Sequence, residues 1–246
     1  MTNDTTTISG ALQEVIDQLE TKLQNKGVNV SYDSTTGILG LIDEIDNIQT
    51  GSNDIVIDWN NINTAGSNVN VPMTQTITEI IIPNTVTSLG NDCFYNYKKL
   101  EKITIPSSVT SFGNYCFYGC TSLTDIIIPS SVTSFGTNCF YHCDSLTSIN
   151  IPSNITSLPN NCFRYSGLTS ISIPSSVTSL GTYCFSNCTS LTSITFEGST
   201  PPTVSNSNAW TSLPTNCTIR VPSGSLNNYT SANNYPSSAT YTYVEY

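Results

Sequence analysis

Prolines recur along this chain of 246 residues at an almost fixed interval. Pro83, Pro106, Pro129, Pro152 and Pro174 follow one another at 23, 23, 23 and 22 residues, so the chain contains repeated units. A unit this short cannot bury its own apolar side chains, and the sequence therefore predicts an array of stacked units. Aligned on the prolines, the units share two apolar columns, Ile80, Ile103, Ile126, Ile149, Ile171, Ile194 and Ile82, Ile105, Ile128, Ile151, Ile173, Phe196.

Each unit reads L-x-x-I-x-I-P-x-x-V-x-x-F/L, followed by C-F and a further Leu. The alternating I-x-I stretch predicts a β-strand with one face inward, and the proline after it ends the strand because it lacks the N–H that a ladder needs. The remaining residues, about 16 per unit, leave room for only a short helical turn around C-F-x-x-C. We therefore predict an α/β repeat solenoid, with a parallel β-sheet on one side, rungs about 4.8 Å apart and short convex helical turns.

The units resemble those of the BspA-like leucine-rich repeat family, which read I-x-I-P-x-x-V-T-x-I-G-x-x-A-F-x-x-C-x-x-L. Residues 103–125 (ITIPSSVTSFGNYCFYGCTSLTD) and 126–148 match this pattern almost throughout, with Cys where the family usually has Ala. Residues 194–204 and 220–229 are similar to the usual ending of that family. The resemblance covers about residues 76–230. It implies a right-handed leucine-rich-repeat solenoid that serves as a binding or adhesion scaffold, and it implies no reaction.

A different pattern precedes the repeats. Apolar residues are spaced by three and four over 8–25 and again over 38–48, which predicts a small N-terminal helical segment within residues 1–50. Two such stripes are too few for an independent core, so we expect residues 8–48 to form a homo-oligomer or to attach the chain to a particle. This segment also resembles the N-terminal part of some phage tail-fibre proteins.

The chain is thus expected to have four parts. Residues 1–50 form the helical attachment or oligomerisation segment, and residues 51–75 form a linker and N-terminal cap. The leucine-rich repeats, with their period of 23, occupy residues 76–197. Residues 198–246 form a C-terminal cap, in which we expect Trp210 to take the place of a repeat phenylalanine.

The charge is low and unevenly distributed. Only 10% of the residues are charged, and the formal net charge is -10. Residues 1–60 hold ten of the 17 acidic and two of the seven basic residues, which gives -8 there and -2 for the rest. Seven Lys and Arg cannot neutralise a phosphate track, so we expect no nucleic acid as partner. We also expect no membrane insertion and no signal peptide, since no apolar run reaches about 18 residues and the start lacks a basic region followed by an apolar one.

The nine cysteines fall mainly into two columns of the repeat. Stacked neighbours lie within Cα range of a disulfide, but their side chains point the same way, which keeps the Cβ atoms near the rung spacing of about 4.8 Å. A zinc site would need two close ligand pairs or histidines at fixed spacing. We therefore expect reduced core thiols that act as small hydrophobic residues. The columns are Cys93, Cys116, Cys139, Cys162, Cys184 and Cys120, Cys143, Cys188, with Cys217 alone.

The one histidine, His142, stands close in sequence to Cys139 and Asp144. A catalytic Cys–His pair needs an exposed and activated thiolate, whereas Cys139 belongs to a core column, so we expect His142 to face solvent. The sequence contains no P-loop, G-x-S-x-G, H-E-x-x-H or EF-hand motif. We accordingly expect no catalytic residue, no cofactor and no metal, and hence no enzyme.

Two surfaces are candidates for binding. Strand alternation places one residue per unit outward, giving a flat and nearly uncharged row of Ile81, Thr104, Ile127, Asn150, Ser172 and Thr195. Tyrosines are expected to stack on the opposite side, in the row Tyr95, Tyr118 and Tyr141, beside Tyr115 and Tyr183. Such rows follow from duplication alone, or they form a surface for a glycan or a protein. A further ladder at the turns is Thr87, Thr110, Thr133, Thr156 and Thr178.

The first hypothesis is a non-enzymatic recognition protein that presents its solenoid to a host-cell glycan or protein, as a viral or phage fibre or receptor-binding component. The alternative is a secreted or cell-surface microbial adhesin, and a remote one is ice or mineral binding by the threonine ladders. The localisation accordingly stays open between a virion assembled inside a cell and a surface reached by a non-standard route.

Overall fold

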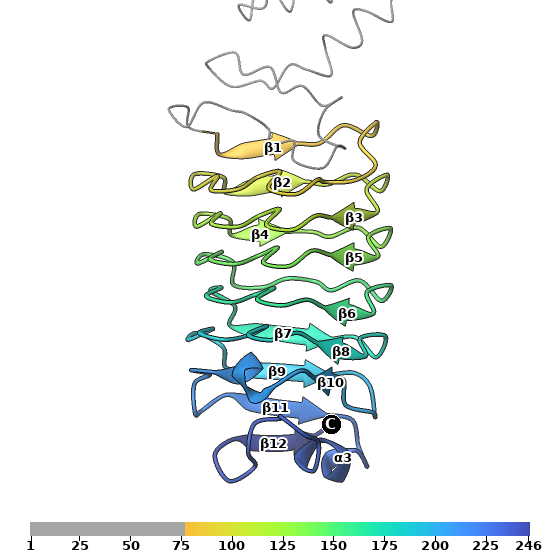
Figure 1. Cartoon of the computed structure of the whole chain (residues 1–246), viewed down its shortest axis with the longest axis vertical. Helices are drawn as coiled ribbons and strands as arrows, with labels where there is room; N and C mark the ends of the chain where they lie inside the picture. The colour runs from red at the N-terminus through yellow and green to blue at the C-terminus, as the bar shows by residue number, and fades with distance from the viewer. Residues whose placement is uncertain (1–76) are drawn as a thin grey trace, which may run out of the picture. The chain divides into compact units, whose positions relative to one another are not determined.

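The computed structural model describes residues 77–246, so the expected segments at 1–50 and 51–75 lie outside the described residues. The described residues form a β-solenoid, in which a turn contributes a primary strand from its I-x-I stretch and a secondary strand from the S-F or S-L pair that follows (Figure 1). The primary strands are β1 (Glu79–Ile81), β2 (Lys102–Thr104), β4 (Asp125–Ile126), β7 (Ser170–Ile173), β9 (Ser193–Phe196), β11 (Thr218–Val221) and β12 (Thr242–Glu245). The secondary strands are β3 (Ser111–Phe112), β5 (Ser134–Phe135), β6 (Ser157–Leu158), β8 (Ser179–Leu180) and β10 (Thr203–Val204).

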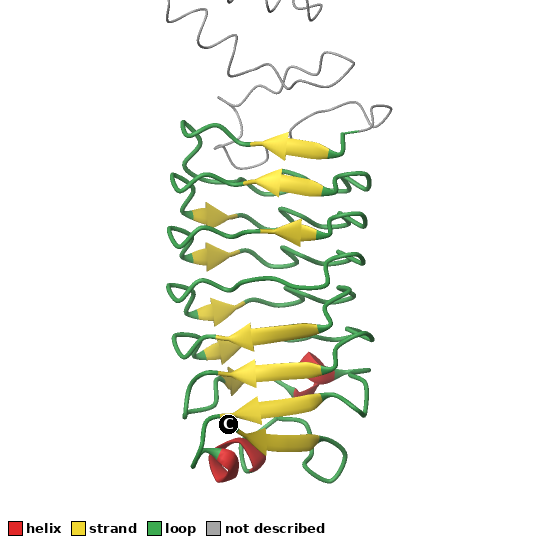
Figure 2. Cartoon of the chain, turned by 180° about the vertical axis from the view of Figure 1, so that it is seen from behind, coloured by secondary structure: helices red, strands yellow, loops and turns green. Residues whose placement is uncertain are grey.

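Every strand pair in the described residues is parallel, and the register follows the repeat. Ile80 pairs with Ile103 and Ile103 with Ile126, so equivalent positions of successive units lie side by side. The view from behind shows the same one-turn-per-level stacking, with loops closing each turn (Figure 2). The predicted parallel solenoid is confirmed.

The apolar columns form one continuous core. The alternating strand positions are buried, as are Val and Leu at their repeat positions, and the Phe of each C-F pair is fully buried. These Phe rings stack along the solenoid axis with centroids 5.3 Å apart at Phe117–Phe140 and 5.6 Å apart at Phe140–Phe163. The stack ends on Trp210, which lies 5.6 Å from Phe185 at an interplanar angle of 11°. Trp210 therefore takes the place of a repeat phenylalanine, as predicted.

The segments around C-F-x-x-C are hydrogen-bonded turns, and the described helices are η2 (Ser207–Trp210) and α3 (Leu226–Thr230) in the C-terminal part. Each repeat turn contains two residues with positive φ. One directly precedes the Cys of the C-F pair, and the other follows that Cys by three residues. Asn and Asp tolerate this left-handed conformation better than bulky residues do. None of the described helices is long and apolar enough to cross a membrane.

Hydroxyl and amide side chains connect successive turns. The carbonyl oxygen of Thr87 accepts hydrogen bonds from both the amide N–H and the hydroxyl of Thr110, at 2.9 and 3.1 Å. The same pair of bonds joins Thr133 to Thr110. An Asn ladder does similar work, since the Asn91 side chain accepts from the Asn114 N–H at 2.8 Å. These inter-turn bonds explain why the repeats are rich in Thr and Asn without being charged, and they occupy the hydroxyl protons that an ice-binding ladder would present.

The strand expected at 149–151 does not form, and the ladders are interrupted at this level. The primary strands separate into one sheet of β1, β2, β4 and another of β7, β9, β11, β12, while β5 and β6 do not pair. Among the primary strands, Asn150 takes the place of the ladder, because its side-chain amide accepts from the Ile128 N–H at 3.0 Å and donates to the Ile128 carbonyl at 2.9 Å. The side chain of Asn150 thus replaces a peptide group of the missing strand.

Replacing Asn150 by alanine should lower the free energy of unfolding by about 1–3 kcal/mol, because it leaves the Ile128 N–H and carbonyl without partners. Urea unfolding followed by circular dichroism measures this change. Ser148→Ala, on an exposed neighbour of the same turn, serves as the control and should stay within about 0.5 kcal/mol of the parent. Equal effects of the two substitutions would show that the Asn150 bridge contributes nothing.

Candidate binding surfaces

The outward positions of the primary strands differ in how much of each side chain remains available. Ile127 and Ile81 are 71% and 59% exposed, and Thr104 lies exposed between them. Asn150 is exposed, but its amide is bonded to Ile128. The Ser172 hydroxyl donates to Glu197 Oε1 at 2.6 Å. The row therefore offers an apolar strip over the first turns rather than a uniform row of free hydroxyls.

The predicted tyrosine stack is present. The rings of Tyr95 and Tyr118 have centroids 4.8 Å apart at an interplanar angle of 11°, and those of Tyr118 and Tyr141 are 4.7 Å apart at 5°. Tyr115 packs against both Tyr95 and Tyr118, at 6.5 and 5.8 Å. Burial and the neighbouring phenols Tyr141 and Tyr95 raise the pKa of Tyr118, which keeps its hydroxyl protonated.

Three residues that the sequence analysis did not assign to a binding surface extend this row. Arg164 occupies the column of Tyr95, Tyr118 and Tyr141 in the next turn. Tyr165, adjacent to Arg164, stacks on His142 with centroids 4.5 Å apart and an interplanar angle of 4°. The repeat alignment carries the signal for both pairs, because Arg164 stands 23 residues after Tyr141 and Tyr165 stands 23 residues after His142. We call the whole set the tyrosine face: Tyr95, Tyr115, Tyr118, Tyr141, His142, Arg164, Tyr165 and Tyr183.

Several rings of the tyrosine face stand on strained backbone. Tyr115, Tyr165 and Tyr183 have φ values of 56°, 60° and 58°, at positions where other turns carry Asn, Asp or Gly. A bulky residue in this region is an outlier and costs about 1–3 kcal/mol. Tyr115 is 39% exposed and the other two are half-buried, so burial in the core does not offset this cost.

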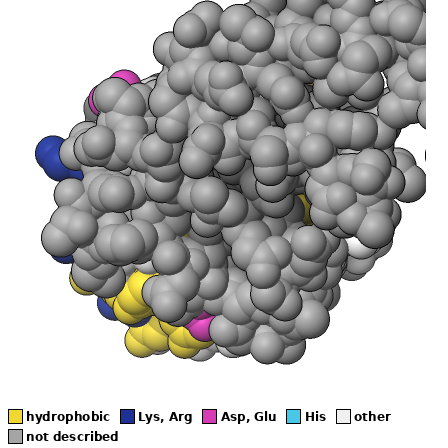
Figure 3. All heavy atoms as spheres, turned by 90° about the horizontal axis from the view of Figure 1, so that it is seen from above, with side chains coloured by type: hydrophobic (Ala, Val, Ile, Leu, Met, Phe, Trp, Pro, Cys, Tyr) yellow, Lys and Arg dark blue, Asp and Glu magenta, His cyan; other side chains and the backbone are white. Residues whose placement is uncertain are grey.

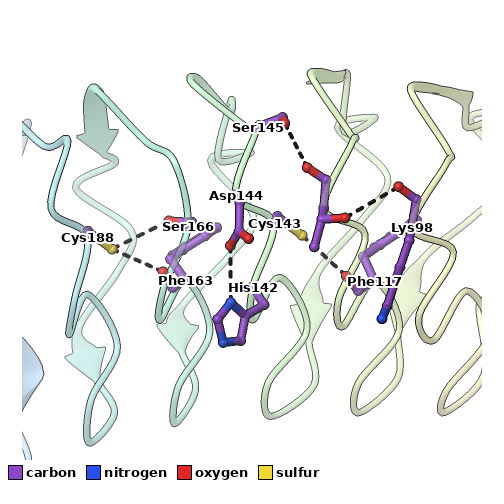
Figure 4. A network of polar contacts seen from close by, with 10 residues as sticks. Lys98, Phe117, His142, Cys143, Asp144, Ser145, Phe163, Ser166 and Cys188 are labelled. Atoms are coloured by element: carbon purple, nitrogen blue, oxygen red, sulfur yellow. Dashed lines mark hydrogen bonds and ion pairs between the residues drawn. The ribbon is translucent and has the colours of Figure 1, made fainter.

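His142 lies at the surface, away from any nucleophile. Its Nδ1 is 3.1 Å from Asp144 Oδ1, and both side chains are about half exposed. Figure 4 shows this pair pointing away from the neighbouring thiols of Cys143 and Cys188. The expectation of a surface histidine is confirmed.

The thiols are buried, and those of Cys120, Cys143 and Cys188 donate hydrogen bonds to main-chain carbonyls. All nine cysteines are free and buried. The Cys143 Sγ donates to the Phe117 carbonyl at 3.2 Å, and the Cys188 Sγ donates to the Phe163 carbonyl at 3.0 Å (Figure 4). Burial raises the pKa of Cys188 to about 11 and the pKa of Cys143 well above 9.0. These sulfurs are protonated core residues, which is the opposite of what nucleophilic catalysis needs.

An open groove lies over the secondary strands β3 and β5 and the residues that follow them. Its volume is about 380 Å³, and Gly90, Gly113 and Gly136 follow its floor through three turns. A Cβ at Gly136 would lie 2.3 Å from the Asn114 nitrogen, so glycine is required for the close approach of successive turns. Close packing of successive turns therefore explains these glycines, and no bound ligand is needed to explain them.

Within residues 77–246, no group of three or more His, Cys, Asp or Glu side chains is placed to hold a metal ion. Seen from above, the visible part of the described surface shows few charged side chains and a gathering of hydrophobic ones at one edge (Figure 3). The exposed large hydrophobic residues of 77–246 are Ile81, Tyr95, Tyr115, Ile127, Val244 and Tyr246.

Comparison with known proteins identifies the repeat. The family described as BspA type leucine rich repeat region matches in six copies, over residues 72–192 and 156–236. The crystal structure of the T. pallidum leucine-rich repeat protein is 26% identical, with a TM-score of 0.47, and the match covers 49% of this chain and 59% of that one. A leucine-rich cell surface protein from Faecalibacterium prausnitzii A2-165 is 25% identical, with a TM-score of 0.44 and coverages of 61% and 56%.

The chain thus spans less than two thirds of the length of these two structures. No curated protein matches its sequence. The family match covers well over half of the chain, and the strand pairing follows the same repeat. The chain belongs to the BspA-type leucine-rich repeat family.

Proposed function

We propose that the protein is a non-enzymatic recognition and adhesion scaffold, and that the tyrosine face is its binding surface. The observation that carries this proposal is the position of Tyr115, Tyr165 and Tyr183 on left-handed backbone at or near the surface. Duplication would copy the Asn or Asp of the other turns, and folding gains little from these rings. Residues that are unfavourable for the fold and gathered on one surface are typical of a functional site.

The chemistry of the described residues supports binding rather than catalysis. Burial raises the pKa of the Cys120 thiol, and His142 pairs with Asp144 rather than with a nucleophile. Tyrosine and arginine are among the residues that contribute most to binding at interfaces, because tyrosine offers large contact area with few rotatable bonds and arginine offers a planar fork of donors.

The proposal includes two settings. In the first, residues 8–48 attach the solenoid to a viral particle or assemble it into a fibre, and the tyrosine face meets a host glycan or protein. In the second, the protein is a secreted or cell-surface adhesin of a microbe. Family membership supports adhesion in general, and fractionation of the native cells or particles separates the two settings.

Replacing Tyr115 by asparagine should weaken binding without weakening the fold. Asparagine stands at the equivalent position in the next two turns, Asn138 and Asn161, so the free energy of unfolding should be unchanged or higher by about 1 kcal/mol. Binding should fall about tenfold, as expected for loss of an interface tyrosine. The full chain is applied to glycan and protein arrays to find a ligand, and each variant is then titrated against it.

Ile127→Thr is the matched control, because it changes the most exposed of the large hydrophobic residues in 77–246 to the residue that Thr104 and Thr195 already provide in its column. We expect it to bind as the parent does. If Ile127→Thr abolishes binding and Tyr115→Asn does not, the primary strands form the binding surface. If the parent binds nothing on either array, the recognition proposal fails.

A further inference from the structure

Arg164 follows three tyrosines in the column Tyr95, Tyr118, Tyr141, Arg164, Ser186. Its guanidinium carbon lies 4.6 Å from the ring centroid of Tyr183, 5.1 Å from that of Tyr165 and 5.9 Å from that of Tyr141. Stacking against three rings holds the planar group in place through cation–π attraction. The arginine is therefore preorganised on the tyrosine face, unlike a freely moving surface lysine.

Among residues 77–246, the positive charge of Arg164 forms no ion pair. The ion pairs there are Lys102–Glu79 and His142–Asp144, so the acid of the preceding turn, Asp144, is paired with the histidine. One Arg164 nitrogen donates to Asn161 Oδ1 at 3.3 Å, and its Nε is buried without a hydrogen-bond partner. A guanidinium carries five N–H donors in a fork that matches a carboxylate. Most of these donors are unused.

The orientation of the rings favours a protein over a sugar as the partner. Tyr118 is covered on both sides by Tyr95 and Tyr141, with the three rings nearly parallel. A sugar stacks its apolar side on the open face of an aromatic ring, and here the stacked row presents ring edges and phenol hydroxyls. Ring edges are electropositive, and the phenols donate hydrogen bonds, so the row complements electronegative groups.

The extent of the tyrosine face fits a protein interface. It runs over five successive turns, from Tyr95 to Tyr183, which is about 20 Å at the rung spacing of a sheet. An extended peptide of about six residues spans that length, at about 3.3 Å per residue. An interface centre rich in tyrosine and arginine and poor in other charges is also the typical composition of binding hot spots.

We infer that the tyrosine face binds an acidic peptide segment of a partner protein, which places an aspartate or glutamate carboxylate on the Arg164 guanidinium and packs its neighbouring side chains along the tyrosine edges. This inference rests on the proposed function and narrows the choice between glycan and protein. It assigns Arg164 as the residue that determines specificity, and the tyrosines as the contact area.

The test selects peptides that bind the full chain. A yeast-displayed library of random linear peptides is sorted with the labelled protein, and the enriched peptides are titrated against variants. We expect enrichment of Asp or Glu next to apolar residues, and binding to Arg164→Ala that is at least about tenfold weaker. Arg164→Lys should bind these peptides more weakly than the parent and more tightly than Arg164→Ala, because lysine keeps the positive charge but lacks the fork of N–H donors.

Arg220→Ala is the matched control for net charge. Arg220 lies over Tyr246, on β11 and away from the tyrosine face, so this variant should bind like the parent. Thermal unfolding of each variant establishes that it is folded. Enriched peptides without acidic residues, or equal binding to Arg164→Ala and the parent, overturn the inference.

A glycan array with the same variants distinguishes this inference from the proposed function. Glycan binding that depends on the tyrosine face, without any peptide enrichment, overturns the acidic-peptide inference and leaves the recognition function standing. If the chain selects no peptide and binds nothing on the glycan and protein arrays, both the inference and the proposed function are overturned.

Discussion

Above about pH 9 the solenoid is expected to lose stability steeply, because burial raises the pKa values of seven core thiols above 9.0. In the unfolded chain these thiols release their protons near pH 9, while in the folded chain they hold them. The unfolded state therefore binds fewer protons in this range, and the free energy of unfolding falls as the pH rises. Below about pH 9 the contribution is fully present.

The loss of stability at high pH is large because the contributions of the individual thiols add. Each thiol contributes about 1.4 kcal/mol per pH unit between its unfolded and folded pKa. For Cys188 and Cys217 that range extends to about pH 11. Several thiols acting together exceed the total stability of a typical domain, about 5–15 kcal/mol, within about two pH units. Urea unfolding in the presence of a reductant, at pH values from about 8 to about 11, measures the slope.

A variant with alanine at Cys116, Cys162 and Cys184 provides the comparison. Its stability at neutral pH should be somewhat lower, since small cavities replace the sulfurs. Its pH slope above about 9 should be shallower by about 4 kcal/mol per pH unit, three times the contribution of one thiol. Identical slopes for parent and variant would show that the buried thiols do not control the alkaline limit.

Replacing Phe140 by alanine is expected to cost about 3–5 kcal/mol of unfolding free energy, the range for removal of a fully buried aromatic ring. The ring is stacked between Phe117 and Phe163, and Phe112 and Phe135 approach its edge. Because each turn of a solenoid contacts only its neighbours, a cavity in the middle uncouples the turns on either side. We therefore expect two unfolding transitions, or one transition that is clearly broadened.

Chemical denaturation followed by circular dichroism, with hydrogen exchange to assign each transition to its turns, checks this result. Tyr141→Ser, one position along the chain, is the control; it removes a ring from the surface stack and should cost less than about 1 kcal/mol. A loss below about 1 kcal/mol for Phe140→Ala would contradict the single continuous core.

The repeat made most of the fold predictable. Strand, burial and register follow from columns, because a residue that is inward in one unit is inward in the next. Trp210 could be assigned in the same way, although no repeat motif surrounds it. Asn150 could not, since alternation indicates only that it points outward. An asparagine amide has the same donor and acceptor as a peptide group, and the side chain of Asn150 is long enough to bring both to Ile128 in the preceding turn.

The tyrosine face was predictable only in part. The stacked row of Tyr95, Tyr118 and Tyr141 follows from their shared column. The stack of Tyr165 on His142 also follows from a shared column, since the two residues are 23 apart. The contacts of Arg164 with Tyr165 and Tyr183 join different columns, and residue spacing does not encode the side-chain directions on which they depend.

The hydrogen bonds that join successive turns are formed almost entirely by uncharged groups, and residues 77–246 contain two ion pairs, both at the surface. Dissolved ions screen charges and leave such neutral bonds nearly unaffected. The solenoid should therefore keep its shape from dilute medium to brine. Ten of the 17 acidic residues lie in positions 1–60. A change in ionic strength should therefore alter the electrostatic interactions of that segment more than those of the repeats. A recognition surface with this construction has the same form wherever it meets its partner.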